Sequence, residues 1–256
     1  MAATVTGQGV GHSFGDLEVI ADVDLTVEPG GVLAVVGPSG CGKSTLLELI
    51  AGLTEPTEGE IEIDGLGSRE DRLARCAYMP QVDCLLPWYS ALDNAALSLL
   101  NRGERKNAAR DRARGPFADL GLAGFESARP NELSGGMRQR VAFLRTFLSD
   151  KPVLLLDEPF AALDAITRAE LQEWLRPILE TRQRTVILVT HDLEEALYLG
   201  DRMLLLSPRP SRVVEDLEAV RPSGAPRAAV LTDPDLIRTR ERLLSLLDSS
   251  GTTAGT

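Results

Sequence analysis

The nine residues from Gly37 to Thr45 have the composition and order of a phosphate-binding loop. They read Gly-Pro-Ser-Gly-Cys-Gly-Lys-Ser-Thr, follow an apolar run that ends at Val36, and precede a helical pattern. Glycines let successive backbone N–H groups turn inward around phosphate oxygens, and the helix N-terminus adds its dipole. In such a loop Lys43 reaches the terminal phosphates and Ser44 holds Mg²⁺. The predicted nucleotide site consists of Gly37, Pro38, Ser39, Gly40, Cys41, Gly42, Lys43, Ser44 and Thr45.

Two acidic residues follow a second apolar run further along the chain. Asp157 and Glu158 come directly after Val153–Leu156 and are followed by Pro159. We expect the run to be a buried strand whose carboxyl end lies beside the phosphate loop. Asp157 can then orient Mg²⁺ and its waters, and the Glu158 carboxylate can polarise the water that attacks the terminal phosphate. The apolar run before the pair argues against a merely solvated acidic turn.

His191 follows a third apolar run, Thr185–Thr190. The same reasoning places it at the same edge of the sheet. A histidine there can contact the terminal phosphate and hold the attacking water and its general base in position. The three motifs together predict a nucleotide hydrolase.

Strands and helices must alternate to bring these residues to one edge. Alternation at this spacing predicts a largely parallel sheet with helices on both faces. A period-two pattern at Gly59–Gly65 adds a hairpin-type strand. The other expected elements are several strands within residues 3–36, strands at 153–156, 185–190 and 203–207, and helices at 43–51, 136–148, 166–180 and 193–199.

Between about residue 84 and the Ser134-Gly-Gly segment the sequence pattern becomes helical, and we expect helices at Leu92–Leu100 and Asn107–Leu120. Near the end we expect one helix at Asp235–Leu247 and disorder from Ser249. The predicted fold class is therefore α/β. It comprises a P-loop NTPase core with a mostly parallel sheet, an N-terminal antiparallel β subdomain and an inserted α-helical subdomain. We assign residues 4–83 and 136–210 to the catalytic core, 84–135 to the helical subdomain and 211–256 to a C-terminal extension of this single domain.

Composition argues against a nucleic-acid binder, a membrane-spanning or secreted protein and a cysteine metal site. The net charge is −11, which argues against a general nucleic-acid binder with a basic footprint. We find no apolar run of about 18 residues and no basic-then-apolar leader, so we expect a cytoplasmic location. The cysteines Cys41, Cys76 and Cys84 lack metal-ligand spacing, which predicts free thiols.

In combination, these motifs closely resemble the nucleotide-binding subunit of ATP-binding cassette (ABC) transporters from about residue 4 to residue 210. The family's signature motif matches Leu133, Ser134, Gly135, Gly136 and Met137, with Met137 where glutamine is frequent. The resemblance implies that Gln81 contacts Mg²⁺ and senses the permease, and that Asp164 lies in a loop that crosses a dimer interface. It also implies that Phe14 stacks on adenine, although an ordinary core aromatic would fit the sequence as well.

The family resemblance further implies a head-to-tail dimer that sandwiches ATP and Mg²⁺. The signature motif of one subunit would complete charge stabilisation at the phosphate loop of the other, so a monomer should hydrolyse ATP poorly. Nucleotide binding would close the dimer and hydrolysis would reopen it. The partner subunit is either a second copy of this chain or a paralogue.

Within the family, the chain is most similar to importers of nitrate, taurine, alkanesulfonates and related small solutes. The similarity rests on residues 81–94, on 159–165 and on Leu206-Ser-Pro-Arg-Pro210. The segment from Gln81 to Trp88 would receive a membrane permease at the cytoplasmic face of the membrane, with a periplasmic or lipid-anchored solute-binding protein acting indirectly. Leu85 and Leu86 could equally pack the helical subdomain. The alternative function is a subunit of an exporter, or of an importer for an unrelated solute class.

Overall fold

Two sheets form the framework of the molecule in the computed structural model, which describes residues 1–219 and 224–252. The larger sheet has six strands in the order β5-β6-β7-β3-β8-β9. The first five run parallel, and β9 pairs antiparallel with β8. The strands are β3 (Val32–Val36), β5 (Cys76–Met79), β6 (Val153–Asp157), β7 (Thr185–Thr190), β8 (Arg202–Leu206) and β9 (Val213–Glu218).

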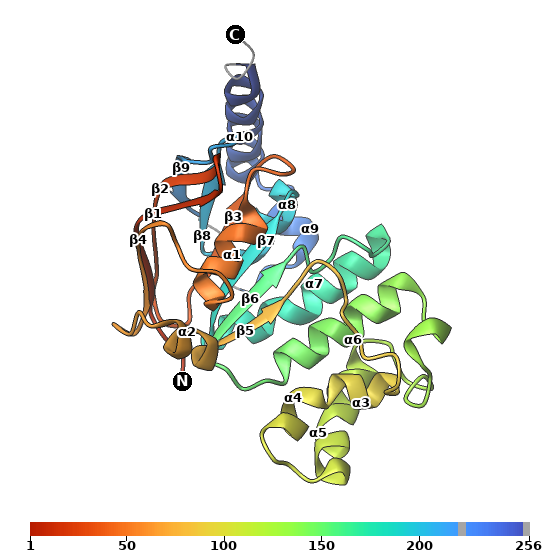
Figure 1. Ribbon diagram of the computed structural model, residues 1–256. Helices are drawn as coiled ribbons and strands as arrows, with labels where there is room; N and C mark the ends of the chain where they lie inside the picture. Colours follow the sequence, from red (N-terminus) through yellow and green to blue (C-terminus); the bar gives the residue numbers. More distant parts are fainter. Residues whose placement is uncertain (220–223, 253–256) are drawn as a thin grey trace.

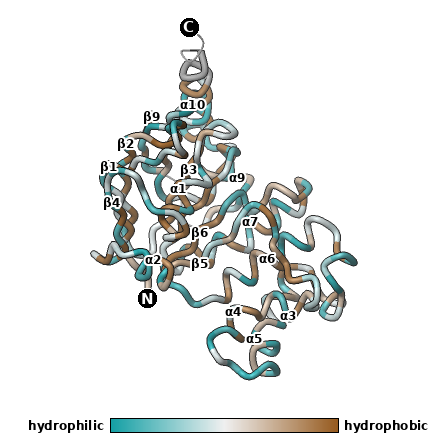
Figure 2. The backbone as a smooth tube through the Cα atoms, in the orientation of Figure 1, coloured by the Kyte–Doolittle hydropathy of each residue, from teal (hydrophilic) through white to brown (hydrophobic). Residues whose placement is uncertain are grey.

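The central strands are apolar because both faces of the sheet are covered. In β3, Leu33 and Val35 point into one hydrophobic cluster while Val32, Ala34 and Val36 point into the other. The strands β6 and β7 alternate in the same way. Near-continuous apolar runs are typical of parallel strands buried on both sides. Figure 2 shows the hydrophobic residues along β5 and β6.

The smaller sheet is antiparallel, as expected, and covers one side of the core. Its order is β2-β1-β4, with β1 at Val5–Phe14, β2 at Leu17–Val27 and β4 at Glu58–Ile63. The helix α1 (Lys43–Ala51) packs between this sheet and the large one, and its leucines are fully buried. The helix ends at Gly52, which adopts the left-handed conformation of a C-terminal cap.

The opposite face carries the remaining core helices and the helical subdomain. The core helices are α6 (Gly135–Phe147), α7 (Ala165–Glu180) and α8 (Leu193–Leu199), and the subdomain contains α3 (Ala91–Ala95), α4 (Leu97–Asn101) and α5 (Lys106–Asp119). In α5, Ala109, Ala113 and Phe117 form one buried stripe at a spacing of four residues. The single helix expected over Leu92–Leu100 is instead two short helices that meet at Ala96.

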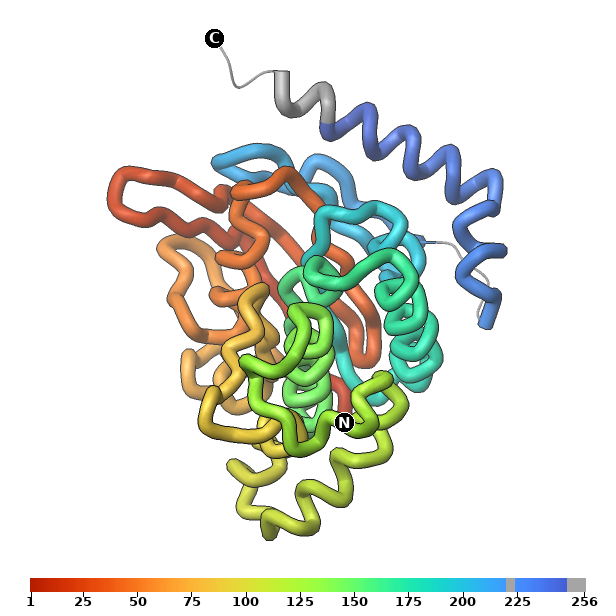
Figure 3. The backbone as a smooth tube through the Cα atoms, turned by 90° about the vertical axis from the view of Figure 1, so that its right-hand side faces the viewer, coloured from red at the N-terminus to blue at the C-terminus, as the bar shows by residue number. Residues whose placement is uncertain are grey.

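The C-terminal region is more ordered than its sequence predicts. In addition to β9, the chain forms α9 (Arg227–Leu231) and α10 (Pro234–Thr252). The last helix therefore continues past Leu247 through residues for which we expected disorder, while residues 253–256 lie outside the described part. Figures 1 and 3 place α10 at the end of the molecule far from the helical subdomain.

Two short helical elements connect the larger ones. The helix α2 (Arg69–Arg75) leads into β5 and begins at Ser68, whose hydroxyl accepts a hydrogen bond from Asp71 N. A short 3₁₀ turn, Pro130–Glu132, precedes α6. No helix within the described ranges is long and apolar enough to cross a membrane.

The helical subdomain contains a partly buried ion pair, between Asp93 and Arg110, whose contribution to stability can be measured. The Arg110 guanidinium donates to both Asp93 carboxylate oxygens at 2.7 and 2.8 Å, and Asp93 is buried. These hydrogen bonds hold the pKa of Asp93 below its usual range, although burial opposes the shift. The pair therefore stabilises the folded state above the unfolded pKa of about 4, and this contribution is lost as the pH falls through the lower folded value.

We expect Asp93→Asn to lower the free energy of unfolding by about 1–2 kcal/mol at pH 7, because charge-assisted hydrogen bonds are lost. Urea denaturation between pH 7 and 3 should show the difference from wild type shrinking below about pH 4. The matched control is Asp111→Asn, whose side chain is exposed on the same subdomain and should change stability by less than about 0.5 kcal/mol. Equal effects of the two substitutions would contradict the assignment.

Candidate functional site

The phosphate loop connects β3 to α1, as its sequence predicts. Gly40 and Gly42 have φ values of +76° and +120°, which L side chains rarely adopt. A Cβ atom on Gly42 would also lie 2.8 Å from Cγ1 of Val19. The Lys43 ammonium donates to the carbonyls of Gly37 at 2.8 Å and Pro38 at 2.9 Å. The loop therefore curls around the Lys43 ammonium, in the shape that such loops use to bind an anion.

Asp157 ends β6 beside this loop and is only 2 % exposed. Burial raises the pKa of its carboxyl group, while the Ser44 hydroxyl opposes the rise. The Tyr78 hydroxyl donates to Oδ2 at 3.4 Å, but Oδ1 is buried with no hydrogen-bond partner in the described chain. A buried carboxylate oxygen without a partner beside a hydroxyl is a suitable donor set for Mg²⁺, which prefers oxygen ligands. The residues present therefore fit the ion.

Glu158 lies at the meeting point of three segments. Its Oε2 atom is 3.3 Å from Nδ1 of His191 and accepts a hydrogen bond from Nε2 of Gln81 at 3.4 Å. Its backbone has φ +46°, an unusual value for a residue other than glycine, and its N–H donates to the Val189 carbonyl at 2.9 Å. Sparsely populated backbone conformations cluster at functional sites. The structure therefore brings together Glu158, His191 and Gln81.

A hydrogen-bonded network behind His191 fixes the position of its backbone. The Thr190 hydroxyl donates to Glu195 at 2.6 Å, and Gln172 Nε2 donates to the same carboxylate at 3.1 Å. Asp192 caps α8 by accepting from the backbone N–H groups of Glu194 and Glu195. Sequence reasoning missed this network, although an aspartate directly before a helical pattern is a recognisable cap.

One open pocket connects the phosphate loop to the residues around Glu158. Phe14 lies on its rim with 53 % of its surface exposed, and the His12 ring meets it edge-to-face at a centroid distance of 4.6 Å. Phe14 is therefore not a core aromatic. Sequence reasoning missed Leu17, Val19 and Arg209, which also line the pocket. The lining residues are Phe14, Leu17, Val19, Ser39, Gly40, Gly42, Lys43, Ser44, Thr45, Gln81, Glu158 and Arg209.

The signature residues, 133–137, lie outside the pocket of the phosphate loop. Ser134 caps the N-terminus of α6 by accepting from Met137 N at 3.2 Å, and Ser134 and Gly135 are exposed. Leu133 is buried, and a Cβ on Gly136 would lie 3.1 Å from Leu163. None of the signature residues is among those that line the pocket of the phosphate loop. One chain therefore presents a helix N-terminus and a hydroxyl that lie outside the pocket of its own phosphate loop.

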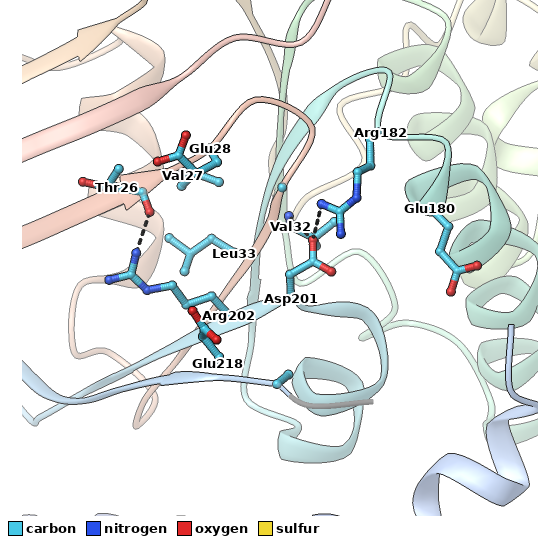
Figure 4. A pocket seen from close by; sticks show the side chains of 12 residues that line it. Thr26, Val27, Glu28, Val32, Leu33, Glu180, Arg182, Asp201, Arg202 and Glu218 are labelled. Carbon is cyan, nitrogen blue, oxygen red and sulfur yellow. Dashed lines mark hydrogen bonds and ion pairs between the residues drawn. The ribbon is translucent and has the colours of Figure 1, made fainter. Parts of the chain in front are cut away.

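A second pocket lies at the opposite, N-terminal edge of the large sheet (Figure 4). Its two arginines are bonded to neighbouring groups: Arg182 pairs with Asp201 at 3.4 Å, and Arg202 donates to the Thr26 carbonyl at 3.0 Å. Asp201 also accepts from Val32 N at 2.9 Å, where β3 begins. These contacts tie the starts of β3 and β8 together, and we assign them a structural role.

Comparison with known proteins agrees with this geometry. The family model described as "ABC transporter" matches residues 20–161. The chain belongs to the ABC transporter family. It is 48 % identical to an aliphatic sulfonates import ATP-binding protein, SsuB 1, of Rhodococcus jostii, over 92 % of this chain and 90 % of the relative. It is 42 % identical to a taurine import ATP-binding protein, TauB, of Pseudomonas fluorescens, over 89 % and 87 % of the two chains.

A solved structure supports the fold assignment of this cassette. The chain is 30 % identical to the ATP-binding cassette MJ0796, seen as a dimer in a post-hydrolysis state with ADP and Pi. The superposition has a TM-score of 0.77 and covers 85 % of this chain and 99 % of the other. The expected family and the expected α/β fold class are thereby confirmed.

In this cassette, two arginines of α6 hold the segment that follows Gln81. Arg138 donates to the Asp83 carboxylate at 2.9 Å and to the Leu133 carbonyl at 2.8 Å. Arg145 donates to the backbone carbonyls of Asp83 and Cys84, each at 2.8 Å. The Gln81 segment and the signature helix are thus linked directly by side chains that sequence reasoning missed.

The expected docking residues near Gln81 divide into buried and exposed ones. Leu85 is buried in the hydrophobic core, so it packs the subdomain. Leu86 is half-buried, and its N–H donates to Asn94 Oδ1 at 2.8 Å. Trp88 is 64 % exposed and lines a depression rich in basic side chains from α5. An exposed tryptophan in a concave, charged surface is a good candidate for partner contact.

Asp164 has a clear local role in the cassette. Its carboxylate accepts from the N–H groups of Ile166 and Thr167 at 3.1 Å each, and from the Thr167 hydroxyl at 2.7 Å. These hydrogen bonds cap α7 and hold the pKa of Asp164 below its usual value. The neighbouring residues Ala161, Ala162 and Ile166 are exposed, so the loop remains available for contact with a second subunit.

The three cysteines differ strongly in accessibility. Cys84 is exposed, whereas Cys41 and Cys76 are buried. Burial raises the pKa of the Cys41 thiol and raises that of Cys76 to about 12. Because the thiolate is the reactive form, both buried cysteines should react slowly.

We expect iodoacetamide at pH 8 to alkylate Cys84 at least about tenfold faster than Cys41 or Cys76. Peptide mass spectrometry over a time course would measure the three rates. Cys84→Ser should remove the fast phase without changing nucleotide binding, since only the Cys84 backbone is held by Arg145. Rapid modification of Cys41 would show that the phosphate loop opens far more than this structure indicates.

Proposed function

We propose that this chain is the ATP-hydrolysing subunit of an importer for a small solute such as a sulfonate, taurine or nitrate. The convergence of Glu158, His191 and Gln81 beside the phosphate loop carries the hydrolase part of the proposal. The similarity to sulfonate and taurine import proteins carries the solute class. The solute itself would not touch this subunit, so these residues determine energy coupling and not solute choice.

The proposed mechanism assigns a role to each side chain at the pocket. Lys43, released from its loop carbonyls, would bind the β- and γ-phosphates, while Phe14 would stack on adenine. Ser44, Asp157 and Gln81 would hold Mg²⁺, which when bound neutralises charge on the phosphates. Glu158 would accept a proton from the attacking water, and His191, 3.3 Å from its carboxylate, would keep it oriented.

The active site would be completed by a second subunit. Ser134 and the N–H groups at the start of α6 are exposed and away from their own pocket, which suits a head-to-tail dimer. A post-hydrolysis dimer is known for the related cassette MJ0796. Whether the partner is a second copy or a paralogue, the Asp164 loop would lie at the same interface.

We further propose that the surface around Trp88 receives a permease at the cytoplasmic face of the membrane. A solute-binding protein, periplasmic or lipid-anchored, would act through that permease. The links from Arg138 and Arg145 to the segment after Gln81 would transmit permease movement to the signature helix. In this arrangement the permease would regulate the rate of ATP hydrolysis.

Glu158→Gln should retain ATP binding and lower the hydrolysis rate by at least about 10²-fold, because the general base is lost. It should also accumulate as a dimer with ATP and Mg²⁺ in size-exclusion chromatography. Ser134→Arg in the same background should bind ATP as a monomer, since the proposed trans contact is blocked; because the substitution also removes the Ser134 cap of α6, circular dichroism checks that the variant is folded. Unimpaired steady-state hydrolysis by Glu158→Gln would remove Glu158 from the role of base.

Co-purification from native membranes tests the transport assignment. We expect Glu158→Gln with ATP to retain a permease with an associated solute-binding protein, and Trp88→Ala in the same background to retain less of both. Mass spectrometry would identify the proteins, and the binding protein's ligand would name the solute. A permease without a binding protein would favour an exporter, and soluble partners alone would contradict the transport function.

A further inference from the structure

We propose that Arg209 binds the phosphate chain of ATP, as a nucleotide contact outside the motifs described above. Arg209 lies in the loop between β8 and β9, within the Ser-Pro-Arg-Pro segment that no step of the mechanism uses. Its side chain is exposed and lines the pocket of the phosphate loop. The inference rests on the proposed function, because it takes ATP as the ligand.

The guanidinium of Arg209 lies close to the phosphate loop at Gly40. A Cβ atom built on Gly40 would be 3.9 Å from Nη2 of Arg209. Gly40 lies within the turn whose N–H groups are expected to surround the phosphates, and Lys43 approaches from inside that turn. Arg209 therefore lies beside the loop, at the pocket that both of them line.

The loop that carries Arg209 is held firmly in place. The Ser211 N–H donates to the Val19 carbonyl at 2.9 Å, and the Ser211 carbonyl accepts from Ala21 N at 3.0 Å, which fixes the loop to β2. Val19 itself lines the pocket. On the other side of Arg209, the Ser207 hydroxyl accepts from Arg212 N at 3.0 Å. A preorganised loop loses little conformational freedom when its side chain binds a ligand.

The charge of Arg209 is not compensated by a neighbouring carboxylate. Within the described chain no acidic oxygen lies within 4 Å of its guanidinium, whereas Arg212 in the same loop pairs with Asp22 at 3.8 Å. Among the residues that line the pocket, Lys43 and Arg209 are cationic and Glu158 is acidic, so the cations are in excess. In a chain of net charge −11, an unpaired guanidinium beside a phosphate loop points to an anionic ligand.

The test compares Arg209→Ala with Arg209→Lys and with Arg212→Ala, a matched control in the same loop. Dissociation constants for ATP, ADP and inorganic tripolyphosphate would be measured with excess Mg²⁺ by competition against a fluorescent ATP analogue. We expect Arg209→Ala to weaken all three ligands about tenfold, as for loss of a charge-assisted hydrogen bond. Arg209→Lys should recover part of the affinity because it keeps the charge but not the planar fork. Arg212→Ala should change each constant less than about twofold.

Three outcomes would overturn the inference. Unchanged dissociation constants in Arg209→Ala would show that the side chain does not contact the ligand. Normal tripolyphosphate binding with weakened ATP and ADP would place the contact on the nucleoside. Normal ADP binding with loss of ATP-driven dimerisation would place Arg209 at the subunit interface. Failure of the proposed function is distinguishable, since Lys43→Ala would then also bind ATP normally.

Discussion

The parallel pairing of β6 with β7 is the constraint on which the site depends. Asp157 pairs with Val189, and the Val189 carbonyl accepts the N–H of Glu158 at 2.9 Å. This bond holds Glu158 at φ +46° and turns its carboxylate toward His191, two residues beyond Val189. A slip of one residue in this register would move every side chain of β6 to the other face of the sheet. The buried apolar strands thus set the geometry of the polar residues at their ends.

The helical subdomain is joined to this edge by charged and polar contacts. Arg138 connects Asp83 to the Leu133 carbonyl, and Arg145 holds the backbone of Asp83 and Cys84. Gln81 in turn donates to Glu158. A movement of the segment after Gln81 would therefore displace both the proposed base and the signature helix. Hydrogen bonds suit such a junction, because they can exchange partners at a smaller free-energy cost than an apolar core can repack.

Charge is distributed unevenly in this acidic molecule. Many arginines bond to nearby carboxylates or carbonyls, including those of the pocket at the N-terminal edge of the sheet. Lys43 is held by its own loop and Arg209 has no acidic partner among the described residues, and both face the pocket of the phosphate loop. The pocket also contains the Glu158 carboxylate, so it places cations and an acidic group side by side, as phosphate and Mg²⁺ together require.

Local sequence patterns were sufficient for the elements and motifs that depend on short-range chemistry. The apolar runs before Asp157 and His191 predicted buried strands, and the glycine spacing from Gly37 to Gly42 predicted the phosphate loop. Local patterns did not predict the secondary structure of segments that are stabilised by contacts with residues distant in the sequence. The strand β9 has no fully buried residue and exposes Val214, Asp216 and Glu218, and it pairs with β8; the helix α10 continues past Leu247.

The sequence by itself determined the family and the fold class and predicted the residues of the candidate site, because these follow from motifs of a few residues with fixed chemistry. Only the tertiary structure decided that Leu85 is buried while Trp88 is exposed, that arginines of α6 hold the Gln81 segment, and that Arg209 faces the phosphate loop. Each of these depends on contacts between segments tens of residues apart, which no local pattern encodes. Helix propensity and strand periodicity describe neighbours along the chain, whereas burial and ion pairing depend on neighbours in space.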